Sequence, residues 1–565
     1  MTGECCTGSG QFGKSRRSRS RCATLLDDDD SLSREQDAQL AAARSLMTRS
    51  VAFLVNPPSP AGHVSNKDSM GGFGQLYPVG ASPFPPIDMP YLAATLGDAG
   101  IPLKVFESGA LRWTLDDLCR EIDATGTANE ALVVVRTSLP TIDWDLEVCA
   151  ELRARCRPAK ILIYGPVVTP LLWRVQREAA VDYAVIGEPD QPVLELLRGK
   201  PPGEIAGLVW RADGQWRQNP ERRFEKNLDA LALPRWELFP IERYTIPKSA
   251  AAGTLRFLPV LSSRGCPFGC NYCPYPVGQG LPWRDRSADN VVDELEHLVR
   301  NLGVQYVIFR DPLFSANKKR VATICEQMLA RGISVQWRCE TRTDCLDEAT
   351  IAIMAKAGCV GVNFGVESID PQVQKNVDRK PISEQQFLET MVQFRKHGIA
   401  TFAFFVVGLP GDTVDTIVDS MRFALRLGAS WTQFTVATPF IGTRLHDWAV
   451  EQGFVAPDHY RIISAHEGSI GNENLTPAQV HRLHRFAQIL QRNFINRRGI
   501  LKNELRRDPA YRLAKGVLDL LMAPFQWVFF VVGSAFLRLS MPHTRRGSAT
   551  VVPHKPRKPV FRASS

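Results

Sequence analysis

The sequence predicts an α/β fold: a doubly wound sheet, then a partial (β/α)6 barrel similar to a TIM barrel, then a helical C-terminal region. Its 565 residues exceed what one hydrophobic core normally holds, so we expect several domains. Hydrophobic content of 44% and charged content of 22% are typical of a globular chain. Short apolar runs alternate with helix-like segments twice, over residues 47–200 and 251–450. This alternation predicts two parallel sheets with crossover helices.

Residues 1–46 are low in apolar content and predict a disordered leader, with Met47 as an alternative start. Within them, "GSGQFGKS" (8–15) matches a phosphate-binding loop. That motif needs a buried strand before it and a helix after it, and here "RRSRSR" follows. We therefore expect no nucleotide site in the leader.

The first series predicts a doubly wound domain over residues 47–200, whose ligand crevice lies at the carboxyl ends of its strands. The Gly/Pro-rich loop 56–88 leaves the first of these ends, where we expect it to cover a ligand. The expected strands are 51–55, 102–106, 131–136, 160–165 and 182–187, and the expected helices are 91–100, 114–123, 143–156 and 170–180.

Residues 201–250 predict a hairpin with Asp213 and Gly214 at its turn, followed by an extended linker. Residues 251–450 then predict the barrel, whose reactive groups belong at the C-terminal ends of its strands. The expected strands lie near 257–262, 304–309, 333–338, 360–366, 400–407 and 432–437.

The C-terminal part divides into a helical region (451–516), an apolar segment (517–540) and a basic disordered tail (541–565). The uncharged run 520–537 is barely long enough to span a bilayer, and its proline and glutamine make it a poor span. Two interpretations stay open. The segment is either a helix buried against the barrel, or one that inserts partly into a membrane face with its basic flanks at the headgroups.

Charge and cysteine content limit the partners and the compartment. The net charge of +9 is concentrated at the two ends, and no helix-turn-helix, zinc-finger or RNA-reading motif accompanies it, so we expect no nucleic acid partner. Thirteen cysteines and a polar opening segment do not fit a secreted disulfide scaffold. We expect a cytoplasmic protein, peripheral at the inner face of the membrane if the apolar segment inserts.

The most informative stretch is "SSRGCPFGCNYCPYPVGQG" (262–280). Cys266, Cys270 and Cys273 stand at CxxxCxxC spacing in a loop that its glycines and prolines keep out of regular structure. Iron–sulfur clusters and structural zinc sites normally take four ligands, and this loop offers three. A zinc site completed from elsewhere and three buried thiols that bind nothing are the alternatives. A cluster with one iron left open for a small molecule accounts for both the number and the loop.

CxxxCxxC with the aromatic Tyr272 before the last cysteine, at the end of the first barrel strand, resembles the radical S-adenosylmethionine (radical SAM) superfamily. The resemblance implies a [4Fe–4S] cluster whose open iron binds SAM. It implies reductive cleavage of SAM to methionine and a 5′-deoxyadenosyl radical, chemistry that the cofactor carries. It also implies an electron donor such as flavodoxin or ferredoxin.

Four more fragments resemble the same superfamily: "VIFRDPLF" (307–314), "GVNFGVESID" (361–370), "FFVVGLPGDT" (404–413) and "TPFIGTRL" (438–445). The second implies hydrogen bonds to the SAM amino group or ribose, and the third implies backbone contacts to adenine. The SAM-binding residues implied by these matches are Tyr272, Asp311, Glu367, Ser368, Gly408, Pro410 and Gly411.

A doubly wound domain before such a barrel resembles the cobalamin-binding class, which includes radical methylases, a ring-forming enzyme of bacteriochlorophyll synthesis and hopanoid-modifying enzymes. Tyr164, Val167 and Pro189 depart from the turns that border the corrin in that class. No DxHxxG is present, so the resemblance implies cobalamin held base-off without a protein histidine, or a domain that has lost its ligand. The cobalamin-binding residues implied are Thr137, Ser138, Gly165, Thr169 and Gly187.

These resemblances together imply cobalamin-dependent methylation of an unactivated carbon. The apolar tail favours a hydrophobic small-molecule substrate, such as a lipid, isoprenoid or tetrapyrrole; a natural product is the other expectation. Radical cyclisation or rearrangement without methyl transfer is an alternative, and a metal-bearing scaffold recruited to membranes is the alternative that is not an enzyme. Trp337 and Arg342 either line the barrel pocket or belong to barrel packing and ion pairs.

Overall fold

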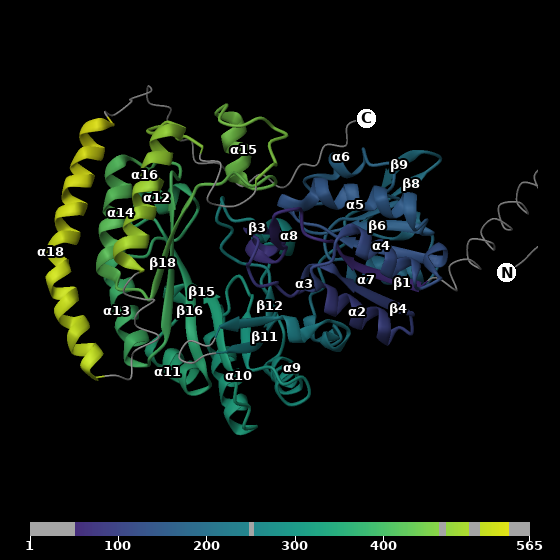
Figure 1. Ribbon diagram of the computed structural model, residues 1–565, viewed down its shortest axis with the longest axis horizontal. Coiled ribbons are helices and arrows are strands. Elements are labelled where there is room, and N and C mark those ends of the chain that lie inside the picture. The colour runs from purple at the N-terminus through teal and green to yellow at the C-terminus, as the bar shows by residue number, and fades with distance from the viewer. Residues whose placement is uncertain (1–50, 248–252, 463–469, 497–508, 542–565) are drawn as a thin grey trace, which may run out of the picture.

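The computed structural model describes residues 51–247, 253–462, 470–496 and 509–541, with side chains in the last range from Pro524 onward. The predicted leader 1–46, with its phosphate-loop-like motif, lies outside the described residues. Two sheets with their helices lie side by side, and a long C-terminal helix lines the outer edge of the second (Figure 1).

The first sheet has the order β4-β1-β5-β6-β7-β8-β9, and its five N-terminal strands are parallel. Numbered along the chain, these five strands follow the flavodoxin-like order 2-1-3-4-5, which confirms the predicted doubly wound sheet. Their bounds are β1 Val51–Asn56, β4 Leu103–Glu107, β5 Ala131–Arg136, β6 Lys160–Tyr164 and β7 Tyr183–Val185.

The predicted hairpin is present and belongs to the first sheet. β8 (Leu208–Ala212) and β9 (Gln215–Gln218) add to β7 as antiparallel strands. Asp213 and Gly214 have φ of 52° and 74°, the left-handed conformations that a type I′ turn requires. The first sheet therefore extends past residue 200.

The helices of the first sheet largely follow the expected segments. Thr114 opens α4 with a capping box, because its side chain and that of Asp117 each accept from the other's backbone N–H. The helices are α2 Met89–Asp98, α3 Ser108–Leu111, α4 Leu115–Asp123, α5 Ile142–Arg155, α6 Leu172–Val175 and α7 Asp190–Leu197.

The expected helix over 170–180 is wrong, because only the four residues of α6 are helical. Side chains take over the hydrogen bonds that a longer helix would use. Trp216 Nε1 donates to the carbonyl of Gln176, and Ala180 N donates to the side chain of Glu178. One long-range bond and one local bond thus replace helical hydrogen bonds in this segment.

Loop 57–88 crosses from the first sheet toward the second. It contains the hairpin β2 (His63–Asn66) and β3 (Gln75–Pro78) and the short helix η1 (Ser69–Gly72). A buried ion pair of 2.8 Å between Lys67 Nζ and Asp145 Oδ1 ties it to α5. Its position at the carboxyl end of β1 is the one expected for a loop that covers a ligand.

The second sheet has the order β10-β11-β14-β15-β16-β17-β18. From β11 onward each strand pairs in parallel with the next along the chain, which confirms the six predicted βα units. The strands are β10 Thr245–Pro247, β11 Thr254–Val260, β14 Tyr306–Phe309, β15 Gln336–Thr341, β16 Cys359–Glu367, β17 Ala400–Val407 and β18 Trp431–Val436, with the small ribbon β12 Ser263–Arg264 and β13 Arg284–Asp285.

Helices cover the outer face of the second sheet (Figure 1). Trp337 is fully buried among aromatic rings and its Nε1 donates to the carbonyl of Ala357, so it belongs to barrel packing. The helices are α8 Tyr275–Gln279, α9 Ala288–Arg300, α10 Lys318–Ala330, α11 Glu348–Lys356, α12 Pro371–Asn376, α13 Glu384–Lys396, α14 Val414–Leu427 and α15 Arg444–Glu451.

The C-terminal region consists of α16 (Pro477–Leu490), the π-helical turn η9 (Gln491–Ile495) and α18 (Pro509–Ser540). The predicted apolar segment lies in α18, which runs along α14 and α16 at the edge of the molecule (Figure 1). In the part of the chain that the structure describes, no helix is long and apolar enough to cross a membrane.

Candidate functional site

The three-cysteine loop follows β11 and β12, at the carboxyl edge of the second sheet. Gly265 begins it with φ of 79°, and a Cβ there would lie 2.2 Å from the carbonyl oxygen of Pro282, so only glycine fits. Cys266, Cys270 and Cys273 are all free and half-buried. The loop therefore presents three accessible thiols at the edge where barrel chemistry is expected.

The three thiols lie within electrostatic range of one another. Burial raises the pKa of both Cys266 and Cys273, and the neighbouring Cys270 adds to this effect, although a backbone hydrogen bond from Phe268 opposes it at Cys266. Among the described residues, however, no three His, Cys, Asp or Glu side chains are close enough to hold a single metal ion. Three thiols on one loop suit an iron–sulfur cluster, because each thiolate binds a different iron rather than one shared ion.

Asp311 supports the start of this loop. It is fully buried at the end of β14, and its carboxylate accepts from Ser262 N at 2.8 Å, Ser262 Oγ at 2.5 Å and Ser263 Oγ at 2.6 Å. Its oxygens are thus engaged by the strand that precedes the cysteines. Farther along, Asn271 N donates to the carbonyl of Val377 at 3.1 Å and fixes the middle of the loop to the barrel.

Glu367 ends β16 in a strained conformation next to the cysteine loop. Its φ is 66°, which is rare for a residue with a side chain and costs about 1 kcal/mol or more. A register shift in the pairing with β17 lies between Gly365 and Glu367. Burial raises the pKa of Glu367, although Arg379, 3.8 Å away, acts in the opposite direction.

Arg379 and Arg342 complete this corner of the barrel. Arg379 Nη2 donates to the carbonyl of Gly365 at 2.5 Å, and its Nη1 lies 3.5 Å from the hydroxyl of Tyr272. Arg379 Nε and Arg342 Nη1 are buried without a hydrogen-bond partner among the described residues. Unpaired guanidinium donors beside a carboxylate suit a ligand that carries both a carboxylate and an amino group, as SAM does.

The segment after β17 is a tight turn built by two polar side chains. Asp412 Oδ2 accepts from the N–H groups of Gly408 and Leu409, both at 3.0 Å. Asn376 Nδ2 donates to the carbonyl of Pro410 at 3.2 Å, and a Cβ on Gly411 would lie 2.2 Å from that nitrogen. Burial raises the pKa of Asp412 to about 7. Ser368, also expected at the SAM site, is buried and its Oγ accepts from Asp370 N.

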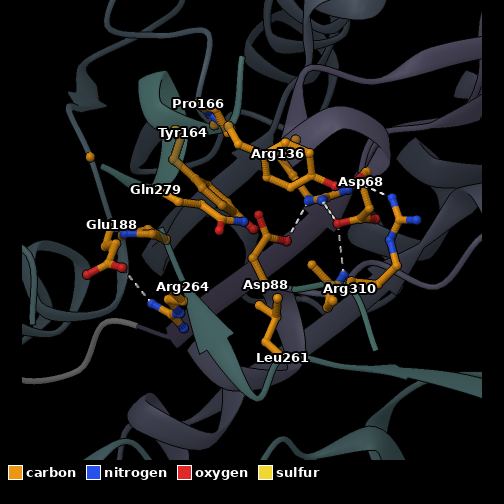
Figure 2. Close-up of a pocket in the computed structure, with 18 of the residues that line it drawn as sticks. Asp68, Asp88, Arg136, Tyr164, Pro166, Glu188, Leu261, Arg264, Gln279 and Arg310 are labelled. Atoms are coloured by element: carbon orange, nitrogen blue, oxygen red, sulfur yellow. Dashed lines mark hydrogen bonds and ion pairs between the residues drawn. The ribbon is translucent and has the colours of Figure 1, made fainter. Parts of the chain in front are cut away.

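A cavity that is partly open to solvent lies where the carboxyl ends of the two sheets meet (Figure 2). Loop 57–88, the ends of β5 and β6, the turn after β7 and helix α8 all contribute to its wall. Of the residues expected to contact cobalamin, Gly165 and Gly187 line this cavity. Thr137 and Ser138 are buried just after β5, where Thr137 Oγ1 donates to Asp145, and Thr169 is not among the lining residues.

Charged side chains line the cavity and pair with one another (Figure 2). Arg136 forms ion pairs with Asp68 and, at 2.5 Å, with Asp88. From the barrel, Arg310 Nη2 donates to the carbonyl of Asp68 at 3.0 Å. Because these charges are compensated, a ligand with neutral polar groups fits better than an ion.

Three buried polar atoms of this wall have no hydrogen-bond partner among the described residues: Tyr164 Oη, Asp190 Oδ1 and Arg136 Nη1. Buried polar groups are normally satisfied, so atoms without a partner in a cavity wall are available to a ligand. Together they offer donors and acceptors, which matches carboxamides such as those on the rim of a corrin. The cavity residues therefore fit cobalamin.

Two contacts join the cavity to the cysteine loop. Glu188, after β7, accepts from Arg264 Nη1 at 2.9 Å and from Arg284 Nη1 at 3.0 Å, and Arg264 stands two residues before Cys266. Burial alone would raise the pKa of Glu188, but the two arginines hold it below its usual value. The ion pairs thus connect the first sheet directly to the three-cysteine loop.

The second contact lies on the barrel side. Tyr275, two residues after Cys273, lines the cavity and donates through its hydroxyl to Glu340 Oε2 at 3.0 Å. Arg310 Nη1 donates to the other oxygen of Glu340 at 2.6 Å. Neither these three residues nor Arg379 were predicted from the sequence, because each becomes recognisable only through a partner on another strand or loop.

Loop 57–88, the turn after β6 and helix α8 meet at Pro166, a residue that lines the cavity (Figure 2), and we call this contact the seam. A Cβ on Gly72 would lie 2.5 Å from Pro166 Cγ, and one on Gly278 would lie 2.7 Å from Pro166 Cβ. On either side of Pro166, in loop 57–88 and in helix α8, there is therefore room only for a glycine.

The family model of the radical SAM superfamily matches residues 260–424, from the cysteine loop through α14. Among curated proteins, an uncharacterized methyltransferase of Pyrococcus horikoshii is 26% identical over 78% of this chain and 94% of its own length. The anaerobic magnesium-protoporphyrin IX monomethyl ester cyclase of Rubrivivax gelatinosus is 27% identical over 64% of this chain and 65% of its own length.

Two solved structures share the fold. The radical SAM methyltransferase TsrM of Kitasatospora setae, solved with cobalamin and a [4Fe–4S] cluster, superposes with a TM-score of 0.57 at 18% identity, over 71% of this chain and 78% of that one. OxsB, described as a cobalamin-dependent S-adenosylmethionine radical enzyme, gives 0.55 at 14% identity over 79% and 62%. With the three-cysteine loop, the parallel barrel and the matching family model, residues 260–424 form a radical SAM domain, and the chain is a radical SAM enzyme.

Proposed function

We propose that this enzyme methylates an unactivated carbon of a small molecule, using cobalamin as the methyl carrier. The observation that carries the proposal is the cavity between the carboxyl ends of the two sheets, whose wall is linked by ion pairs to the three-cysteine loop. A substrate held there lies between the radical-generating barrel and the first sheet. The methyltransferase and cobalamin enzymes that it resembles support this proposal.

Cys266, Cys270 and Cys273 would hold the [4Fe–4S] cluster. When bound, the reduced cluster supplies an electron that cleaves SAM to methionine and a 5′-deoxyadenosyl radical. Glu367 and Arg379 would orient the amino and carboxylate groups of SAM, with Tyr272 and Ser368 beside them. The turn at Gly408, Pro410 and Gly411 would hold the adenine, and Asp311 would keep the cysteine loop in place from below.

Gly165 and Gly187 would admit the corrin, and Tyr164 and Asp190 would bind its carboxamides. When bound, cobalamin supplies a methyl group to the substrate. We propose that it is held base-off without a histidine ligand from the protein, since no histidine is among the described residues that line the cavity. Thr137 and Ser138 would support the turn beneath it, and Thr169 would act from outside the cavity.

The substrate that we propose is hydrophobic, since α18 exposes an apolar face through which the enzyme could meet lipids. The electron donor would be a small redox protein such as flavodoxin or ferredoxin. All ten of the described cysteines are free, in keeping with a reducing cytoplasmic compartment. Membrane contact through residues 520–537 would place the enzyme peripherally at the inner face.

The test is anaerobic expression with hydroxocobalamin, followed by iron, zinc and cobalamin analysis of the purified chain. We expect a four-iron cluster, near-stoichiometric cobalamin, and 5′-deoxyadenosine formation that replacing any of the three cysteines by alanine abolishes. Candidate substrates should yield products heavier by one CH₂ unit. Intact cluster chemistry without bound cobalamin would contradict methyl transfer and favour ring closure, the reaction type of the similar cyclase.

A further inference from the structure

The outer side of α18 is an apolar stripe. From Pro524 to Leu537 the helix carries no charged residue. Phe530, Ser534 and Leu537 are buried against the barrel helices. At about 100° per residue the opposite side carries one continuous row. That row is Phe525, Val528, Val532, Phe536 and Leu539, whose exposed fractions are 68%, 60%, 63%, 68% and 85%.

Exposed hydrophobic side chains are concentrated on α18 rather than scattered over the protein surface. Eight of the fourteen large hydrophobic side chains that are exposed in the described residues belong to α18. Single exposed apolar side chains are normal, but contiguous patches mark interaction sites. A helix that is apolar on nearly all sides needs cover on each of them.

The stripe is held in place by α16 and η9. The ring of Phe529 lies 5.6 Å from that of Phe486 and 5.0 Å from that of Phe494, measured between centroids. A Cβ on Gly533 would lie 2.5 Å from Phe486 Cε2, so the two helices approach as closely as glycine allows. The stripe is therefore a fixed surface of the protein.

Positive charge borders the stripe. Arg482 and Arg485 of α16 are exposed at the edge of the open groove between the two helices, and neither forms an ion pair with a described residue. The sequence beyond α18, residues 542–565, adds six Lys and Arg and no Asp or Glu. An apolar face rimmed by cations is complementary to an anionic lipid surface.

We propose that this stripe, with Arg482 and Arg485, docks the enzyme onto an anionic bilayer, with α18 lying in the plane of the membrane. The inner side of α18 stays on the barrel, where Arg422 lies 5.7 Å from the ring centroid of Phe530, so the helix inserts only its outer face. A two-fold contact between copies of the chain would instead bring like charges together, which disfavours a dimer through this face.

The inference deepens the proposed function and rests on it for its use, because docking would give the barrel access to hydrophobic substrates. Membrane binding itself requires no radical chemistry. Failure of docking and failure of the proposed reaction are therefore measured separately.

The experiment is flotation of the purified full chain with phosphatidylcholine vesicles, with and without phosphatidylglycerol. The test variant combines Val532→Glu with Phe536→Glu. The matched control combines Leu329→Glu on α10 with Val392→Glu on α13, which are exposed by 45% and 52% away from the stripe. A third variant combines Arg482→Gln with Arg485→Gln. Circular dichroism and 5′-deoxyadenosine formation in detergent check that each variant is folded.

We expect the wild type and the control to float with the anionic vesicles. The stripe variant should bind roughly a hundredfold more weakly, because two large apolar groups no longer insert. The arginine variant should bind anionic vesicles roughly thirtyfold more weakly and neutral vesicles unchanged. Retained binding by the stripe variant would overturn the proposal. So would a wild type that ignores vesicles and instead forms a dimer that the stripe variant abolishes.

Discussion

Replacing Glu188 by alanine should loosen the three-cysteine loop from a distance. The carboxylate is 16% exposed and contacts two arginines that are 10% and 6% exposed, at 2.9 and 3.0 Å. At an effective dielectric constant of about 20, each contact is worth about 5–6 kcal/mol before desolvation is counted. Measured losses after removal of one partner from a buried pair are about 3–5 kcal/mol, and we expect a loss in that range.

The assay is chemical denaturation combined with hydrogen exchange of residues 262–285. Glu195→Ala is the matched control, since Glu195 also pairs with two cations, Lys200 and Arg222, but within the first domain. These partners are more exposed, so we expect a loss of about 1 kcal/mol and no faster exchange in the cysteine loop. Equal losses in the two variants, or unchanged exchange in Glu188→Ala, would refute the reasoning.

The same ion pairs set a pH dependence. Because Arg264 and Arg284 hold the pKa of Glu188 below its value of about 4.5 in the unfolded chain, their contribution is present above that pH. It is lost as the pH falls through the lower folded pKa. The wild type should therefore be more stable than Glu188→Gln at neutral pH, and this difference in stability should shrink on acidification. Denaturation midpoints of both proteins at pH 7 and pH 4 will measure it.

Three further changes test the site. Cys345 lies within electrostatic range of Cys266 but is not needed for a cluster held by three thiolates. The Cys345→Ser protein should therefore keep the iron content and the 5′-deoxyadenosine formation of the wild type. Loss of the cluster would point to a fourth protein ligand. Glu367→Gln should keep the fold but weaken SAM binding by roughly tenfold or more, because a charged hydrogen bond is lost. Equilibrium dialysis measures this affinity, and an unchanged value would show that Glu367 does not contact SAM. Burial raises the pKa of Asp412 in the folded protein to about 7, so the free energy of unfolding should fall as the pH rises from about 3.8 to 7, by up to about 1.4 kcal/mol per pH unit. Asp412→Asn should flatten this fall when denaturation is measured over a series of pH values. Stability curves of wild type and variant that run parallel would contradict the assignment.

The sequence predicted the strands well, because each is a short apolar run whose burial leaves little choice of position. "ALVVVR" is β5 to the residue, and the Asp213–Gly214 turn follows from local chemistry alone. The helix expected over 170–180 failed because Trp216, 40 residues further along, takes a carbonyl bond in that segment. The periodicity of apolar residues cannot predict that a side chain far along the sequence will bond a backbone carbonyl of the expected helix.

The site residues likewise fall into those that a local pattern predicts and those that only long-range contacts bring together. The three cysteines and the Gly408–Gly411 turn are local patterns, and they were predicted from spacing and resemblance. Arg310, Glu340 and Tyr275 lie far apart along the chain and meet only when β14, β15 and the cysteine loop come to one edge of the barrel. Arginines and glutamates of this kind usually mark a solvated surface, so the sequence gives no signal that distinguishes them.

The contact of Gly72 and Gly278 with Pro166 bears on how the enzyme acquires and keeps a large cofactor. A large molecule held in the cavity leaves more easily when the first sheet and the barrel move apart at this seam, so its residence time depends on the rate of that opening as well as on its contacts. A bulkier side chain at Gly72 would prop the seam open. Loading would then become faster and retention shorter, even with every cavity contact preserved.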